Sequence, residues 1–241
     1  MRRGWQTGIG SRRRGAREDR AACWQIGASS IPACLSAKHE MIFDNNFKPK
    51  KGKYDFGWHC RRRLPHLDAE SWTQFVTFRL YDSLPQSLLD KWRTECASDA
   101  KFRKRIERYL DSGVGECFLA DPAIALIVED TLKFHAGTKY LLHSWVLMPN
   151  HGHVLMTPMA GVHLPDIMHS VKSYSAQMAN RRLGRSGQFW QHESFDRYIR
   201  DRRHFNAVVR YIELNPVKAG LCDKPAEWRF GSAYAKTLPI E

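Results

Sequence analysis

Hydrophobic residues are grouped along the chain in stretches whose length and composition predict strands. The stretch 72–80 is rich in β-branched and aromatic residues, which favour a strand. Two apolar runs, 140–148 and 151–157, are separated by a Pro-Asn turn and predict two further strands. A fourth extended segment is expected within 189–200.

Other stretches carry apolar residues at helical spacing. Helices are expected after Pro85 and over 100–110, and a third begins at Asp121-Pro122 and runs to about His135. A longer helix is expected over 164–183, where Ile167, Val171, Tyr174 and Met178 form the apolar set and Tyr174 is expected in the core. Asp201 can cap a final helix from about Arg202 to Leu214, which is expected to stop at Asn215-Pro216.

The order of these elements indicates the fold class. Strand, helices, two strands, helix, strand and helix predict an α+β protein, with an antiparallel sheet and helices packed on one face. The second face of the sheet is expected to be free for a ligand. The pattern places one domain at 71–235, without an internal repeat.

The start of the chain has a different composition. Residues 1–40 are dominated by Arg, Gly and Ser, and such a segment buries too little apolar surface to offset its ordering entropy. We expect a disordered basic extension there. It is either a DNA-binding arm or an untranslated upstream stretch, with Met41 as the start. Residues 41–70 are expected to form an extended lead-in.

Charge and cysteine usage narrow the function classes. With Lys+Arg 38 against Asp+Glu 25, the net charge is +13, which favours a polyanionic partner such as nucleic acid. The 6 cysteines include no Cys-x-x-Cys pair, which argues against a zinc finger or a disulfide framework. Without an apolar run long enough for a membrane span, or a secretory signal, we expect a soluble, cytoplasmic protein with no membrane partner.

Two histidines at the start of the third predicted strand are candidate metal ligands. Side chains two positions apart in a strand project from the same face, so His151 and His153 can reach one point, and Leu155 continues that face. Neutral imidazole is a common ligand of divalent cations. By itself the pair is weak evidence for a metal site, because two ordinary, partly buried histidines explain it better.

A second pair of residues lies on the last predicted helix. Tyr211 and Asn215 stand four positions apart and therefore share one face of that helix. If this face lies over the histidines, His151, His153 and Asn215 would hold Mg²⁺ or Mn²⁺ with room left for phosphate oxygens. Tyrosine alone is a poor nucleophile, but its attack on a metal-bound phosphate is plausible.

Four motifs together resemble a known family. They are Met148-Pro-Asn-His-Gly-His153, Gly187-Gln-Phe-Trp-Gln191, Phe195-Asp-Arg-Tyr-Ile-Arg200 and Tyr211-Ile-Glu-Leu-Asn-Pro-Val-Lys-Ala-Gly-Leu221. This combination resembles the REP-associated tyrosine transposases, a branch of the HUH single-tyrosine (IS200-like) transposases, where U is a hydrophobic residue. The resemblance extends from about Arg61 to Tyr234.

The resemblance implies a ferredoxin-like sheet and a metal-dependent enzyme that cuts single-stranded DNA beside a palindromic hairpin. His151 and His153 match the metal-binding pair of the family, and Tyr211 matches the nucleophile that forms a 5′-phosphotyrosine link. Asn215 falls where the family places a third metal-coordinating group. Gly152 departs from the pattern because it stands where a hydrophobic residue is usual, and its lack of a side chain predicts a looser histidine pair.

Three functions remain open at this point. The first is a DNA transposase that cleaves and rejoins single strands in transposition and recombination. The second is a domesticated hairpin-binding protein with little or no catalysis, and the third is a replication or mobilisation nuclease, which usually carries further domains. The chain contains no Walker-type phosphate loop, so no nucleotide cofactor is expected. Monomer and homodimer both remain open, with a lean to the monomer.

Basic and aromatic residues around the motifs are candidate DNA contacts. The set expected to bind DNA is Lys172, Arg181, Arg182, Trp190, Arg197, Arg200 and Lys218. The arginines and lysines would contact phosphates, which makes binding salt-dependent. Trp190 would stack on an unpaired base, with core packing as its alternative. Tyr198 is a weaker candidate than Tyr211 for the nucleophile because its spacing offers no metal partner.

Overall fold

The computed structural model describes residues 57–60, 65–68 and 71–238 of the chain. The predicted basic extension at 1–40 lies outside these residues, and so does most of the lead-in at 41–70. The described part of that lead-in holds two short antiparallel strands, β1 (Gly57–Cys60) and β2 (Pro65–Asp68). Within the described ranges, no helix has both the length and the apolar character needed to cross a membrane.

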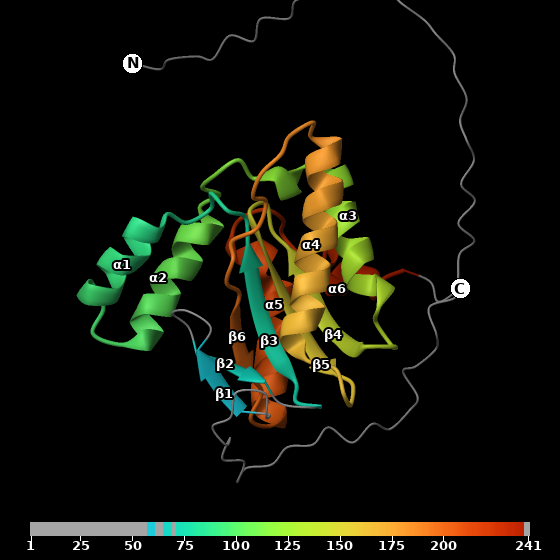
Figure 1. Cartoon of the computed structure of the whole chain (residues 1–241), viewed down its shortest axis with the longest axis horizontal. Coiled ribbons are helices and arrows are strands. Elements are labelled where there is room, and N and C mark those ends of the chain that lie inside the picture. Colours follow the sequence, from blue (N-terminus) through green and yellow to red (C-terminus); the bar gives the residue numbers. More distant parts are fainter. Residues whose placement is uncertain (1–56, 61–64, 69–70, 239–241) are drawn as a thin grey trace, which may run out of the picture. The chain divides into compact units, whose positions relative to one another are not determined.

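Four antiparallel strands form the main sheet (Figure 1). They are β3 (Gln74–Arg79), β4 (Tyr140–Leu147), β5 (His151–Pro158) and β6 (Phe195–Tyr198). Their spatial order is β4-β5-β3-β6, so β3 and β5 are the two central strands. In the register of this pair, Thr77 lies opposite His153 and Arg79 lies opposite His151.

The helices connect these strands in a βαββαβ order. The longer ones are α1 (Gln86–Glu95), α2 (Asp99–Asp111), α3 (Pro122–Phe134), α4 (Leu164–Arg182) and α5 (Arg202–Lys218). Three short helices complete the fold: η1 (Phe118–Ala120), η2 (Pro225–Glu227) and α6 (Ser232–Ala235). The helical connections from β3 to β4 and from β5 to β6 each pass over one strand of the sheet, while a turn joins β4 to β5. With this strand order the sheet is ferredoxin-like. The α+β class and the antiparallel sheet predicted from the sequence are confirmed.

One face of the sheet carries the main hydrophobic core. The strand residues of this core project from the face of the sheet opposite to His151 and His153. They pack against α3 and α4, which lie together in front of the sheet in Figure 1. Val76, Phe78, Val154 and Met156 are all completely buried there. Their burial supplies the hydrophobic stabilisation of this layer.

The opposite face of the sheet is also covered, which corrects the expectation that helices pack on one face only. Helix α5 lies behind the sheet in Figure 1, and its Ile212 is completely buried against Phe75 and Leu155. The physical reason is that Phe75 and Leu155 would otherwise expose a large apolar surface on this face. A ligand therefore has access only where α5 leaves the face uncovered.

Helices α1 and α2 form a helical hairpin with a small core of its own. Leu84, Trp92 and Leu110 are its buried members. The Ser98 hydroxyl accepts a hydrogen bond from the amide of Lys101 at 3.3 Å and so caps α2. This hairpin stands beside the sheet in Figure 1 and forms a wall of the site described below.

Helix α5 begins as predicted but ends later. The Asp201 carboxylate accepts a hydrogen bond from the His204 amide at 2.7 Å, which confirms the predicted cap. The predicted stop at Asn215-Pro216 is wrong, because the helix continues through Pro216 to Lys218. A proline costs one helical hydrogen bond but does not always end a helix, and here the Ala219 amide still donates to the Asn215 carbonyl at 3.0 Å.

Candidate active site

The two predicted metal ligands lie side by side on β5. His151 and His153 are 1 % and 2 % exposed, and their ring centroids are 4.8 Å apart. Because β5 is a central strand, its neighbours β3 and β4 fix the backbone on both sides. The pair therefore rests on one of the most strongly held segments of the fold.

Each imidazole is oriented through its Nδ1 atom. His151 Nδ1 lies 2.7 Å from Asn150 Oδ1, and His153 Nδ1 lies 2.8 Å from Thr77 Oγ1. With Nδ1 as the donor in both bonds, each Nε2 keeps a free lone pair, which is the arrangement that metal-binding histidines require. Asn150 is held in turn, since its amide group donates to the carbonyls of Leu110 and Val114 at 3.1 and 2.9 Å.

Burial keeps both imidazoles neutral. Desolvation, with the nearby Arg79 guanidinium, lowers the pKa of His151 to about 3. Desolvation, with His151 and Lys218, lowers the pKa of His153 well below its usual value. Neutral imidazole is the form that coordinates a metal ion, so the site is ready to bind a cation at neutral pH.

The space above Gly152 is filled by another residue. An ideal Cβ on Gly152 would lie 2.6 Å from Cζ of Phe78 and 3.1 Å from Leu147. Phe78, opposite Gly152 in the register, is completely buried. Phe78 thus packs where the usual hydrophobic side chain would lie, and the looseness predicted for the histidine pair has no basis in this packing.

Helix α5 brings Tyr211 and Asn215 to the histidines. The Tyr211 ring packs edge-on against His153, with 5.4 Å between ring centroids, and against Phe75 at 5.8 Å. Asn215 is 2 % exposed, and within the described part of the chain its Oδ1 atom has no hydrogen-bond partner. A buried acceptor without a partner is costly unless something else satisfies it.

These donors fit a divalent cation. The two free Nε2 atoms and the orphaned Asn215 Oδ1 form a neutral nitrogen and oxygen set that suits Mn²⁺ or Mg²⁺. In the part of the chain that the structure describes, no three His, Cys, Asp or Glu side chains are grouped to hold a metal. Asn215, expected from the sequence as a third ligand, offers an amide oxygen, a donor type that this grouping does not include.

Two carboxyl groups on α2 face the tyrosine. Burial and the charges of Glu107 and Asp111 raise the pKa of Tyr211 above its usual value. Lys218 Nζ lies over the Tyr211 ring, 4.8 Å from its centroid. Burial and the acidic neighbours therefore favour the protonated phenol.

A cavity of about 530 Å³ opens beside the two histidines. Its walls are the sheet, the α1–α2 hairpin and the loop that precedes β6. Arg79 lines it next to His151, and burial lowers the pKa of this guanidinium to about 10 despite the nearby Glu193. The Nε atom of Arg79 is buried without a hydrogen-bond partner. A cationic group of this kind suits a phosphate oxygen in the cavity.

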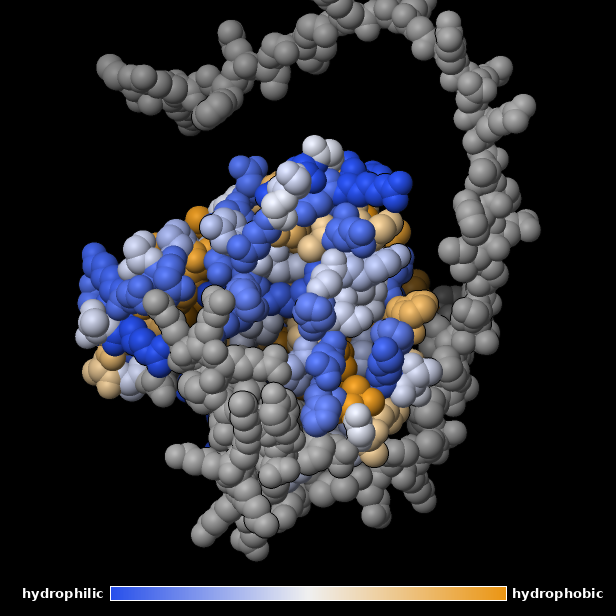
Figure 2. Space-filling model, viewed as in Figure 1, coloured by the Kyte–Doolittle hydropathy of each residue, from blue (hydrophilic) through white to orange (hydrophobic). Residues whose placement is uncertain are grey.

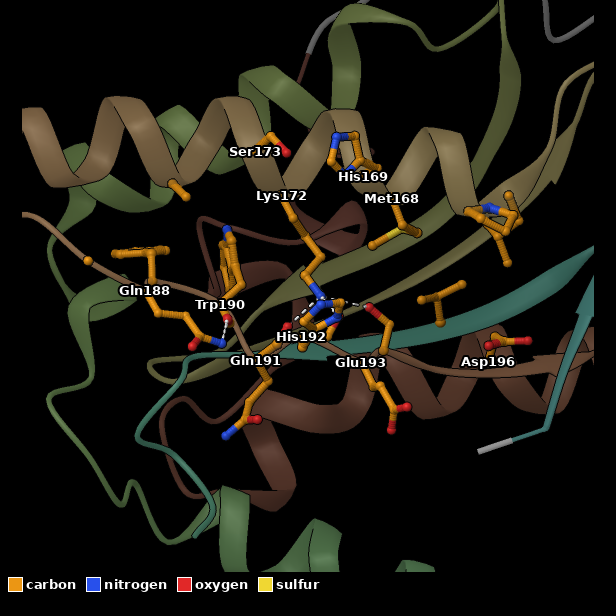
Figure 3. Close-up of a pocket in the computed structure, with 17 residues that line it drawn as sticks. Met168, His169, Lys172, Ser173, Gln188, Trp190, Gln191, His192, Glu193 and Asp196 are labelled. Carbon is orange, nitrogen blue, oxygen red and sulfur yellow. Dashed lines mark hydrogen bonds between the residues drawn. The ribbon is translucent and has the colours of Figure 1, made fainter. Parts of the chain in front are cut away.

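Two of the predicted DNA-binding residues have structural roles instead (Figure 3). Trp190 is 4 % exposed and donates its indole N–H to Ser175 at 2.9 Å, so it has no free ring face and the predicted base stacking is wrong. Lys172 crosses from α4 to the loop and donates to the carbonyls of Gln191 and His192. Burial lowers the pKa of Lys172 to about 8. The hydrogen bonds that Lys172 donates hold the loop between α4 and β6.

The predicted arginines lie on exposed surface. Arg181 and Arg182 are at the end of α4 and do not line the cavity beside the histidines. The face that carries α4 is largely hydrophilic (Figure 2). Partial burial lowers the pKa of Arg197, and the charges of Arg103 on α2 and of Arg200 lower it further.

The competing tyrosines lie elsewhere. Tyr198 is on β6, where its ring contacts Trp72 at 6.0 Å. Tyr174 is 55 % exposed, so its expected core position is wrong. Helix α4 packs instead through Ile167, Val171 and Ser175, one turn apart from each other. Of the tyrosines considered, Tyr211 is the one that contacts a histidine of the pair.

Several functional residues were not identified from the sequence. Thr77, Arg79 and Glu107 come from β3 and α2, and nothing in their local sequence points to the histidines. Asn150 carried a signal, since it directly precedes His151, but it was assigned only to the turn. Pairing of β3 with β5 is the structural fact that brings the first two residues to the site.

Fold and site together define a class: a ferredoxin-like α+β protein with a buried His-x-His pair on a central strand and a tyrosine packed against it. Residues 130–215 match the family model described as Transposase IS200 like, and this range contains both histidines, Tyr211 and Asn215. Over this segment the resemblance to that family is confirmed, and the chain is similar to the IS200-like transposases there.

Other comparisons add similarity in fold. A solved structure of a REP-associated tyrosine transposase bound to a REP hairpin is 17% identical, with a TM-score of 0.47, and the match covers 74% of this chain and 89% of that one. A candidate transposase from Deinococcus radiodurans R1 is 12% identical, with a TM-score of 0.30, covering 65% and 98%. A search of curated proteins finds no match. The fold assignment rests on the strand order of this chain.

Proposed function

We propose that this protein is an IS200-like transposase, a metal-dependent single-stranded DNA endonuclease and strand transferase that acts beside palindromic hairpins of the REP type. The observation that carries the proposal is the contact of Tyr211 with His153, beside the unpaired oxygen of Asn215. This contact supports a role for Tyr211 as a nucleophile beside a neutral donor set for a cation. The proposed physiological setting is the cytoplasm, where the protein acts on DNA as a monomer or homodimer.

His151, His153 and Asn215 would hold Mg²⁺ or Mn²⁺. The bound ion would polarise the scissile phosphate and stabilise the charge that develops on it. The chain supplies the remaining parts of the site. Asn150 and Thr77 orient the two imidazoles, and Arg79 offers a buried cationic group to a phosphate oxygen.

The phosphotyrosine bond would retain the free energy of the DNA phosphodiester bond that is cut. The Tyr211 hydroxyl oxygen attacks the phosphorus, the bond from phosphorus to the 3′ oxygen breaks, and the phenol proton is lost. The products are a 5′-phosphotyrosine and a free 3′-hydroxyl. In rejoining, a 3′-hydroxyl attacks the phosphotyrosine and releases Tyr211, so no nucleotide cofactor is needed.

Exposed basic residues would hold the DNA around this site. Lys218 lies over the Tyr211 ring, and Arg197 is influenced by the charge of Arg103 on α2. These two residues and Arg200 would contact the DNA beside the site, and Arg181 and Arg182 at the end of α4 would contact another part of the substrate. Phosphate contacts of this kind position the DNA and give binding a strong salt dependence.

A second candidate function is hairpin binding without catalysis. It is favoured by the raised pKa of Tyr211, because a phenol that keeps its proton is a poor nucleophile. This function predicts hairpin affinity that does not change in Tyr211→Phe, and no covalent adduct with any metal.

The test is a cleavage assay with end-labelled single-stranded DNA that contains palindromic repeats from around the gene. Wild type, Tyr211→Phe and His151→Ala are incubated with Mn²⁺, Mg²⁺ or EDTA and resolved on a denaturing gel. The proposal expects a protein-linked band for wild type with metal only. Tight hairpin binding with no adduct from wild type would establish the second candidate instead.

A further inference from the structure

The α1–α2 hairpin forms one wall of the cavity beside the histidines. Its two helices carry a small core of their own, separate from the cores that pack on the sheet. The cavity that lies between this hairpin and the histidine strand has a volume of about 530 Å³. Sites for small ligands usually measure about 300–1,000 Å³, so there is room for one nucleotide unit of a DNA strand.

The two facing walls of the cavity differ in polarity. The sheet wall carries the two histidines and Arg79, which suit a cation and a phosphate. The hairpin wall carries Leu89 of α1 with Phe102 and Ile106, which stand one turn apart on the same face of α2. All three apolar side chains are half-buried, because they pack on the hairpin core and also line the cavity.

The charges on the hairpin wall balance. Asp90 and Glu107 line the cavity together with Arg93 and Arg103, so this wall has no net charge. An uncharged, partly apolar wall across from a cationic one suits a ligand with an anionic end and an apolar end. A nucleotide has this character, with its phosphate at one end and a flat base at the other.

Phe102 and Arg93 supply surfaces of the kind on which bases stack. The Arg93 guanidinium carbon lies 5.9 Å from the centroid of the Phe102 ring, and both side chains line the cavity. Unpaired bases stack on aromatic rings and on guanidinium planes, and such stacking tolerates any base because every base has a π-face.

We propose that the α1–α2 hairpin holds an unpaired base of the DNA, in a nucleotide that flanks the phosphate at the histidine pair, and that this base stacks on Phe102. Leu89 and Ile106 complete the apolar wall around the base. The inference rests on the proposed function of the same site. It adds a means of positioning, because a base fixed by the hairpin also fixes the phosphate that is joined to it.

The hairpin has supports that do not involve Phe102. Arg105 of α2 forms an ion pair with Glu95 of α1 at 2.7 Å, and its guanidinium carbon lies 4.9 Å from the ring centroid of Trp92. Trp92 is buried in the hairpin core. Phe102→Leu keeps an apolar side chain on that core, so this variant is expected to stay folded while it loses the aromatic ring.

Binding of DNA that lacks single bases tests the contact. Hairpin DNA with an unpaired flank is compared with the same DNA made abasic at one unpaired position at a time. Fluorescence anisotropy is measured in EDTA, so that the proposed metal-dependent cleavage cannot occur. Loss of a stacked base costs about 5- to 150-fold in affinity, and wild type is expected to lose this much at one position.

A cycle of the two changes assigns the base to Phe102. Phe102→Leu is expected to bind intact DNA at least about fivefold more weakly than wild type. At the sensitive abasic position the variant should lose less than about twofold more, because both changes remove the same contact. Losses that multiply would overturn the role of Phe102, since the two changes would then act independently. An abasic series without any sensitive position would overturn it as well.

Phe134→Leu is the matched control. Phe134 is 77 % exposed on α3 and does not line the cavity, so this variant should keep the affinity of wild type and its full loss at the abasic position. Stacking neutralises no phosphate, so the slope of log affinity against log salt in Phe102→Leu should equal that of wild type. A reduced slope would contradict the stacking role, because the loss would then come from a displaced cation such as Arg93.

Photocrosslinking gives an independent measurement of the same contact. 5-Iodouracil is placed at the sensitive position, because this base joins to an aromatic ring that stacks on it when irradiated. Wild type and Phe134→Leu should form the crosslink, and Phe102→Leu should not. A crosslink that persists in Phe102→Leu would show that the base stacks elsewhere.

The outcomes separate this inference from the proposed function. No covalent adduct from wild type with metal would overturn the proposed function, and the base contact would then be judged by the binding measurements in EDTA alone. If an adduct forms, the cut site can be mapped. A sensitive position that does not flank the cut phosphate would overturn the inference and leave the proposed function standing.

Discussion

The ring of Phe78 lies where a side chain on Gly152 would be. An ideal Cβ on Gly152 would come within 2.6 Å of Phe78 Cζ, and the two residues are directly opposite in the register of β3 and β5. The residue between the histidines is therefore small because its cross-strand neighbour is large. Packing of the histidine strand against the core depends on Phe78 in this protein.

Exchanging the large side chain at position 78 and the small residue at position 152 tests this relationship. Gly152→Val alone should overpack the core and lower the free energy of unfolding by about 1–3 kcal/mol. Phe78→Ala alone should leave a cavity and lower it by about 3–5 kcal/mol. The double variant should be more stable than the sum of the two losses predicts, because the valine fills part of the cavity. Urea denaturation of all four proteins measures the coupling, and strictly additive losses would contradict it.

The hydrogen bonds at Nδ1 are expected to tune metal binding. Asn150→Ala and Thr77→Val each remove the partner of one imidazole, so Mn²⁺ affinity should fall by about 10- to 100-fold. Calorimetric titration measures this affinity. Thr131→Val is the control for the second variant, because the Thr131 hydroxyl donates to the Ile127 carbonyl within α3. Equal losses in Thr77→Val and Thr131→Val would show that the effect is not specific to the site.

Stability should depend on pH through His143. Burial lowers the pKa of His143 from 6.5 to about 4, and its Nε2 lies 2.7 Å from Thr157 Oγ1. Below pH 6.5 the unfolded chain binds a proton that the folded protein excludes. Stability is therefore complete above pH 6.5 and is lost as pH falls towards about 4.

The size of this effect gives a test. The pKa shift of His143 corresponds to a loss of about 3 kcal/mol in the free energy of unfolding between pH 6.5 and about pH 4. The lowered pKa values of His151 and His153 act in the same direction. Urea denaturation of His143→Gln between these pH values should show a shallower decline than wild type. A decline of the same steepness would mean that His143 does not stay neutral in the folded protein.

Substitutions of the surface arginines and of the buried Lys172 should have different effects on the salt dependence of DNA binding. Arg197→Ala and Arg200→Ala are each expected to reduce the slope of log affinity against log salt by about 1, since each removes a phosphate contact. Lys172→Met should leave that slope unchanged and lower stability, because Lys172 holds loop carbonyls. Fluorescence anisotropy of labelled hairpin DNA at several salt concentrations gives the slopes. A reduced slope in Lys172→Met would restore its predicted role in DNA binding.

Local patterns were enough to predict the parts of the site that lie on one element. Strand alternation placed His151, His153 and Leu155 on one face, and helical spacing placed Tyr211 and Asn215 together. These relationships depend only on backbone geometry. The helix continues through Pro216, but this does not change them, because Asn215 is still in the helix.

Relationships between elements could not be predicted in this way. Trp190 was expected to stack on a base, yet its indole finds a buried partner in Ser175. Tyr174 has core spacing, yet α4 is rotated so that Ser175 is buried and Tyr174 is exposed. Glu107 lines the cavity beside His151 and His153 although it comes from α2, and no local pattern indicates this. Such contacts depend on tertiary packing, which overrides local propensity.

The most direct measurement for the whole account is mass spectrometry of the covalent adduct. Wild type is incubated with hairpin DNA and Mn²⁺, the DNA is digested to a short remnant, and the protein is cleaved with trypsin. Cleavage after Arg210 and Lys218 releases the peptide from Tyr211 to Lys218. The account predicts a nucleotide phosphate on this peptide, linked to Tyr211. A nucleotide found on the peptide from Tyr198 to Arg200, or on no tyrosine at all, would contradict it.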